Sequence, residues 1–149
     1  MGWLANHAPT AGAVISLTIY SCAIMVFIAR LLRAPRLESW AGLLRISTAV
    51  PLAMLIAVAP RASRPLIYYV QLSLMVGYLL TTLIVDHILF LEFRTNLRYV
   101  IAYVMLFFGA SGGMLGVASL AGQRWLIAAL VLFFIMAVLA FVQRAVTGK

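Results

Sequence analysis

Apolar residues run along this chain in five long stretches, separated by short breaks that carry arginine. Each stretch approaches the roughly 20 residues that a helix needs to cross a hydrocarbon core. The pattern predicts an all-α, polytopic membrane helical bundle, folded as a single transmembrane domain over residues 1–149. The predicted transmembrane helices cover residues 11–32, 39–59, 65–91, 97–120 and 125–142.

Two of these spans depart from a plain apolar helix. The second carries Arg45 about two turns from its start and Pro51 near its middle, which favours a kinked and slightly polar helix. The third is long enough to reach roughly 40 Å at the α-helical rise, so it tilts or extends beyond the membrane.

Composition strengthens the membrane assignment. Hydrophobic residues make up 66% of the chain and charged residues 9%, against roughly a quarter charged in a typical soluble domain. The single cysteine, Cys22, excludes an intramolecular disulfide and a CxxC metal site. The basic residues lie at the ends of apolar runs and form no stripe with interleaved aromatics, so the net charge of +8 predicts no nucleic-acid partner.

The loop charges predict an orientation, because cytoplasmic loops carry an excess of lysine and arginine. An outside N-terminus and a cytoplasmic C-terminus, in the plasma (inner) membrane, place three basic residues outside and eight inside. The outer residues are Arg61, Arg64 and Arg124, and the inner ones are Arg30, Arg33, Arg36, Arg45, Arg94, Arg98, Arg144 and Lys149. The cluster that follows the first span is typical of topology determination, with recognition of anionic lipid headgroups as the alternative.

Polar side chains share one face of the third span. Their spacing of three, seven, four and four residues keeps them within a sector of roughly 80°. In lipid such groups need partners, so this face lines a path for an ion, proton or small solute, or it makes interhelical hydrogen bonds. We also expect an ion pair between Arg45 and Asp86. The polar stripe consists of Tyr68, Gln71, Tyr78, Thr82 and Asp86.

Small residues dominate one side of the fourth span. Gly109, Gly113 and Gly116 share one face, and Gly112, Gly116 and Ser119 share the next. This small-xxx-small spacing lets two helix backbones approach closely. We expect close packing within the bundle or between protomers, and the alternative is a helix broken at these glycines to line a binding site.

One short motif in the fourth span bears a resemblance to an enzyme family. The GASG sequence at residues 109–112 resembles the nucleophile motif of rhomboid intramembrane proteases, which implies a serine nucleophile at Ser111. That family supplies a histidine base from a later helix and has at least six spans. No histidine follows Ser111 here, and His87 precedes it in another span. We therefore predict no catalytic residues.

Metal and cofactor chemistry is not expected either. The acidic residues are Glu38, Asp86 and Glu92, and they form no evident carboxylate cage. The two histidines, His7 and His87, fall near opposite membrane faces, so one protomer does not clamp a haem between them.

These observations favour one function and leave two open. The favoured hypothesis is a small, oligomeric membrane protein that mediates permeation or transport of an ion or small solute along the polar stripe. The first alternative is a non-catalytic accessory subunit of a larger membrane complex. The second is a membrane enzyme acting on a lipid or isoprenoid, with Asp86, Arg45 or His87 contributing. The expected partners are membrane lipids and either further copies of this chain or other membrane subunits.

Overall fold

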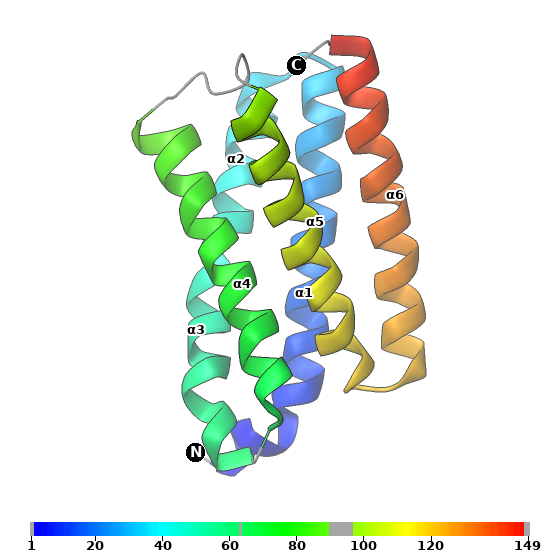
Figure 1. Cartoon of the computed structure of the whole chain (residues 1–149). Coiled ribbons are helices and arrows are strands. Elements are labelled where there is room, and N and C mark those ends of the chain that lie inside the picture. The colour runs from blue at the N-terminus through cyan, green and yellow to red at the C-terminus, as the bar shows by residue number, and fades with distance from the viewer. Residues whose placement is uncertain (1, 63, 90–96, 148–149) are drawn as a thin grey trace.

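The computed structural model describes residues 2–62, 64–89 and 97–147, and this part of the chain is almost entirely helical, with no strand (Figure 1). Five helical segments are long and apolar enough to span a membrane, with α2 and α3 together forming one of them. The predicted all-α bundle is confirmed at this level. The helices are α1 (Gly2–Leu31), α2 (Pro35–Ser47), α3 (Ala49–Val58), α4 (Leu66–Thr82), α5 (Leu97–Ser119) and α6 (Gln123–Thr147).

The five segments run alternately up and down, so the two chain termini lie at opposite ends of the bundle (Figure 1). We call the end that holds the chain's C-terminus the C-terminal end, and the other the N-terminal end. Helix α1 packs against α2, α3, α5 and α6, whereas α4 packs mainly between α3 and α5. Helix α1 is therefore the central element, and half of its apolar segment is buried.

The second span is interrupted at Thr48, where α2 ends and α3 begins. Pro51 lies three residues further on and has no N–H to donate to the carbonyl of Ser47. The local hydrogen bonding shifts accordingly, because the Thr48 N–H and hydroxyl both donate to the Arg45 carbonyl, at 3.2 and 2.6 Å. This break separates a polar half-helix that bears Arg45 from an apolar one.

Two shorter helical segments complete the chain. A 3₁₀ turn, Ala59–Ala62, follows α3. A π-helical segment, Leu83–Ile88, continues α4 and contains Asp86. The third span thus reaches Ile88 and changes its winding after Thr82. The residues beyond Leu89 that the sequence assigned to it lie outside the described part.

Buried side chains fill the middle of the bundle between its two ends. Rings from three helices meet there: Tyr20 of α1 packs edge-on against Phe133 of α6, and Phe27 of α1 packs against Phe107 of α5. Several of the core side chains are fully enclosed. These include Leu52, Leu72, Met75, Leu79, Ala110, Met114 and Met136.

Candidate functional site

The polar stripe of α4 points into the bundle. Tyr68, Tyr78 and Thr82 are almost completely buried, and Gln71 is half-buried. The Thr82 hydroxyl donates to the Tyr78 carbonyl at 3.0 Å and lies 3.0 Å from the hydroxyl of Tyr103 on α5. These side chains therefore pack between helices.

Gln71 fits against the glycine face of α5. A Cβ added at Gly113 would lie 3.4 Å from Cβ and Cγ of Gln71. One added at Gly116 would overlap the Gln71 amide nitrogen and lie 3.0 Å from its Cδ. Gly109 faces Leu74 of α4, whereas Gly112 faces open space. The glycines thus allow α4 and α5 of the same chain to approach, and the homo-oligomer stays a prediction.

Helix α1 makes the polar contacts that the sequence analysis overlooked. The Ser16 hydroxyl donates to the Met114 carbonyl at 3.2 Å, in addition to a bond of 2.8 Å to Gly12 in its own helix. The Tyr20 hydroxyl donates to the Ser111 carbonyl at 2.6 Å. The spacing of four residues between Ser16 and Tyr20 is the signal that marks a polar face on the first span.

The structure does not bring Ser111 and His87 together. Ser111 is buried within α5, and its carbonyl accepts the Tyr20 hydroxyl. His87 instead packs against α2, where its ring would lie 3.8 Å from a Cβ added at Gly42. The serine motif therefore has no histidine base among the described residues.

A cavity of about 150 Å³ opens at the C-terminal end of the bundle. We call it the end cavity. It has the volume of several water molecules, and its walls come from α1, α2, α4 with its π-helical extension, α5 and α6. The charged and polar lining residues are Arg30, Arg45, Tyr78, Asp86, Tyr103, Gln143 and Arg144. The apolar ones are Val26, Phe27, Val100, Val104, Phe107, Phe108 and Ala140.

Arg45 is the unusual member of this lining. Its side chain projects from α2 into the bundle, and the residue is only 6% exposed. The guanidinium carbon lies 5.6 Å from the centre of the Tyr78 ring, which is within the range of a cation–π interaction. Its buried Nε has no hydrogen-bond partner. A buried cation with an unused donor is costly in a protein interior, so it marks a place where a partner is missing.

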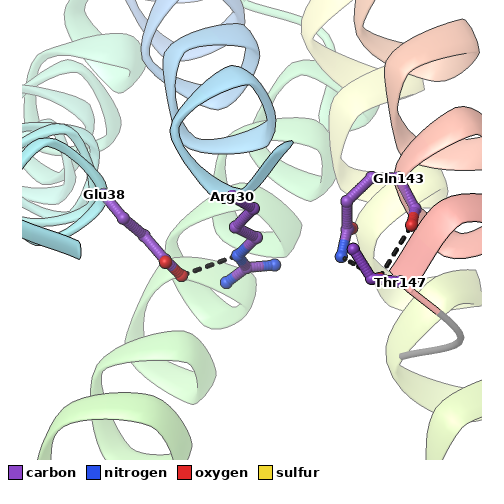
Figure 2. Close-up of polar contacts among 4 residues, drawn as sticks. All are labelled: Arg30, Glu38, Gln143 and Thr147. Carbon is purple, nitrogen blue, oxygen red and sulfur yellow. Dashed lines mark hydrogen bonds and ion pairs between the residues drawn. The ribbon is translucent and has the colours of Figure 1, made fainter. Parts of the chain in front are cut away.

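Asp86 faces the same cavity as Arg45, but the two do not form a salt bridge. The carboxylate has a favourable charge interaction with the guanidinium. Within the ranges that the structure describes, the one salt bridge joins Arg30 and Glu38, with 2.6 Å between Nε and Oε1 (Figure 2). The direct Arg45–Asp86 ion pair expected from the sequence is therefore not formed, although both residues line the end cavity.

The π-helical segment places Asp86 at the cavity wall. The Leu89 N–H donates to the Ile84 carbonyl at 2.8 Å, with the five-residue spacing of a π-helix. Single π-helical turns inside α-helices are frequent at functional sites. No pattern in the sequence predicts this π-helical winding. His87 follows Asp86 but is not part of the lining, and its buried Nδ1 has no partner.

The turn between α1 and α2 builds the rim of the end cavity. Helix α1 ends with a paired hydrogen-bond motif: the Ala34 N–H donates to the Ala29 carbonyl, and the Arg33 N–H to the Arg30 carbonyl. This is the Schellman pattern, with Arg33 in the left-handed conformation (φ 53°) that glycine usually adopts. The turn brings Glu38 back over Arg30.

The C-terminal turn of α6 forms the opposite rim. The Gln143 amide donates to the Thr147 hydroxyl at 3.1 Å, and that hydroxyl donates to the Gln143 carbonyl at 2.8 Å (Figure 2). A shallow hollow between the two rims is lined by Arg30, Arg33, Glu38, Gln143 and Thr147, among others. The rim is therefore polar and lies next to the charged part of the cavity.

Basic residues outnumber acidic ones in the lining of the end cavity. No group of three or more His, Cys, Asp or Glu side chains comes together in the described ranges, and Glu92 lies outside them. Arg30 shares its charge with Glu38, which leaves Arg45 and Arg144 against Asp86 and a net positive lining. In comparisons with known proteins, no family model, no curated protein and no solved structure matches this chain.

Proposed function

We propose that this protein is a membrane carrier for a small anionic solute and that the end cavity is its binding site. The observation that supports this most strongly is Arg45, a cation buried inside the bundle with an unpartnered Nε at the cavity. Ionisable groups at membrane depth are costly and commonly belong to substrate or ion paths. An anion in the cavity would supply the missing hydrogen-bond acceptor and compensate the charge.

The packing favours a carrier over a permanently open pore. The cavity is open at the C-terminal end and reaches Tyr78, which precedes Asp86 by eight residues, or about 12 Å of helical rise. Towards the N-terminal end, the core side chains Leu72 and Met114 are fully enclosed. A solute bound in the cavity would cross only if these helices rearranged, as alternating access requires.

We further infer that the C-terminal end faces the cytoplasm and the N-terminus faces outward, as the arginine distribution predicts. Paired reporter fusions at the C-terminus test this orientation in a bacterial host. A fluorescent protein should fluoresce there, and alkaline phosphatase, which requires an oxidising compartment, should be inactive. Active phosphatase and a dark fluorescent protein would reverse the assignment.

Flux into proteoliposomes tests the carrier proposal. A panel of labelled anions, namely chloride, phosphate and short-chain carboxylates, is offered to vesicles holding the parent protein, Arg45→Gln or Asp86→Asn. For at least one anion, the parent should exceed protein-free vesicles and Arg45→Gln should lower uptake about tenfold, because a charged hydrogen bond is lost. Asp86→Asn removes a repulsive charge, so anion binding should tighten.

Arg36→Gln is the matched control, since Arg36 is exposed at the same end and does not line the end cavity. It should transport as the parent does. Gln71→Leu should also leave selectivity unchanged, because Gln71 packs against α5 and lies outside the end cavity. Equal flux in the parent, Arg45→Gln and protein-free vesicles for the whole panel would refute the carrier proposal.

A further inference from the structure

The end cavity has two chemically different sides. Its inner side carries the guanidinium of Arg45 and the rings of Tyr78 and Tyr103. Its outer side is formed by Val104 and Phe108 of α5 and by Ala140 of α6, which are only partly covered by the rest of the chain. Val104 is 39% exposed.

The partly covered side faces the bilayer. Val104 and Ala140 lie in the segments of α5 and α6 that have membrane-spanning length and composition. Next to the cavity, Phe108 stacks on Phe141 of α6, with 6.1 Å between ring centres, and Phe141 is largely exposed. We call the line along which Val104 and Phe108 of α5 lie next to Ala140 and Phe141 of α6 the α5–α6 seam. On one side of it is the cavity with its cationic residues, and on the other is an apolar surface that contacts lipid chains.

From this arrangement we propose that the anion of the end cavity is the headgroup of a membrane amphiphile, which enters sideways between α5 and α6. The phosphate or carboxylate group binds Arg45 and Arg144, and the hydrocarbon chain stays in the bilayer along Val104 and Phe108. The inference rests on the proposed anion site and specifies its ligand as a lipid-borne anion.

Size and charge both support this assignment. A cavity of about 150 Å³ accommodates a headgroup but not a whole lipid, so a bound amphiphile leaves its chain outside. Arg144 is exposed at the rim, where a headgroup passes from the membrane interface to Arg45. A fully water-soluble anion would need no partly open apolar wall at the level of the hydrocarbon chains.

Photo-crosslinking tests the proposal directly. Phosphatidylcholine vesicles containing the parent protein receive a small fraction of phosphatidic acid, or of phosphatidylcholine as the zwitterionic reference, each with a diazirine in the acyl chain. After irradiation, mass spectrometry maps the labelled residues. Phosphatidic acid should label the α5–α6 seam around Val104, Phe108 and Phe141 about tenfold more than the zwitterionic lipid does.

Four variants, one of them a control, separate the headgroup contact from general packing. Arg45→Gln should remove the preference for phosphatidic acid, and Arg45→Lys should restore part of it by keeping the charge. Val104→Trp places a bulky ring at the lipid-facing edge of the cavity and should block labelling with the arginines intact. Arg36→Gln, an exposed arginine outside the cavity, should label as the parent does.

Competition by soluble inorganic phosphate distinguishes the two sources of the anion. Unlabelled phosphatidic acid and millimolar inorganic phosphate are each added as competitors of the labelling. If phosphate abolishes the labelling as effectively as unlabelled phosphatidic acid, the ligand is a soluble anion and the lipid inference is wrong, while the carrier proposal stands. Equal labelling by both lipids, or labelling spread evenly over all lipid-facing helices, would show ordinary boundary lipid and overturn the inference. If the parent protein transports none of the anions in the flux panel but phosphatidic acid still labels the α5–α6 seam, only the carrier proposal is refuted.

Discussion

The two ends of this bundle differ in how their most buried polar side chains are bonded. Towards the N-terminal end, Ser16 and Tyr20 donate to carbonyls of α5, and Gln71 packs against glycines of the same helix. At the C-terminal end, Arg45 keeps a buried donor without an acceptor and faces Asp86 across a cavity. A polar side chain at membrane depth therefore does not by itself indicate a binding site, because most of the polar side chains here hold helices together.

The contrast also assigns different roles to the two parts of the polar stripe. Its second residue, Gln71, belongs to the packed region, whereas Tyr78 and Asp86 belong to the cavity. By the packed region we mean the contacts of Ser16, Tyr20 and Gln71 with α5 and the buried side chains around them. Two groups near the N-terminal end are exceptions, since the buried Tyr68 hydroxyl and the buried Arg64 Nε have no partner. If the contrast is correct, substitutions in the packed region change stability and substitutions at the cavity change ligand handling.

The largest expected effect is overpacking at Gly12. Three helices converge on this residue of α1, and a Cβ there would lie 2.7 Å from Cγ1 of Val117 on α5 and 3.8 Å from Leu55 on α3. Val117 is a stiff, buried β-branched residue, so Gly12→Ala should lower the free energy of unfolding by about 1–3 kcal/mol. Denaturant titration in detergent micelles, followed by circular dichroism, measures it.

Gly112→Ala is the matched control, since a Cβ added there meets nothing within 4 Å. It should leave stability unchanged or raise it by about 0.5–1 kcal/mol through better helix propensity. If Gly12→Ala is as stable as Gly112→Ala, the close contact of α1 with α5 is not what holds the packed region together.

The second prediction concerns the stability cost of the site itself. Arg45→Met replaces a buried, incompletely bonded cation with an unbranched apolar side chain of roughly similar volume. Without ligand, the free energy of unfolding should stay unchanged or rise by about 1 kcal/mol, while anion binding is lost. A loss of several kcal/mol would contradict this, because it would show that Arg45 is held in the fold by partners such as Asp86 and serves as structure.

Sequence patterns indicated the fold well and the site only in part. Five apolar runs predict five spanning segments because hydrocarbon thickness sets their length, and the small-residue spacing located the close-packed face of α5. Arg45 and Asp86 stand out in the sequence because charge is rare in apolar runs, and both line the end cavity. Their separation across a cavity depends on the break at Thr48 and on the π-helical winding before Ile88, which composition does not encode.

The central position of the first span is not evident from the sequence. Its polar residues are few, yet α1 is the central helix and its Tyr20 reaches an α5 carbonyl. The four-residue spacing of Ser16 and Tyr20 marks a polar face on this span, but it does not say which helix that face contacts. Burial of α1 results from the packing of four other helices around it, and no local pattern specifies that arrangement.

The smallest expected effect is the loss of one interhelical hydrogen bond. Tyr20→Phe removes the donor to the Ser111 carbonyl and should lower the free energy of unfolding by about 0.6–1 kcal/mol. Tyr99→Phe, at an exposed tyrosine of α5, should have no measurable effect. Neither substitution lies at the end cavity, so flux should remain at the parent level. A change of anion selectivity in Tyr20→Phe would contradict the separation of roles between the packed region and the end cavity.

Thiol accessibility measures the central contrast most directly. In a Cys22→Ala background, one cysteine replaces either Val100, which lines the end cavity and is otherwise covered by the chain, or Ala118, which is fully buried in the packed region. A water-soluble anionic methanethiosulfonate should modify the Val100→Cys variant at least about tenfold faster than the Ala118→Cys variant, and faster than a cationic reagent of similar size does. Equal rates at the two positions, or a preference for the cationic reagent at Val100→Cys, would contradict a wet, anion-attracting cavity.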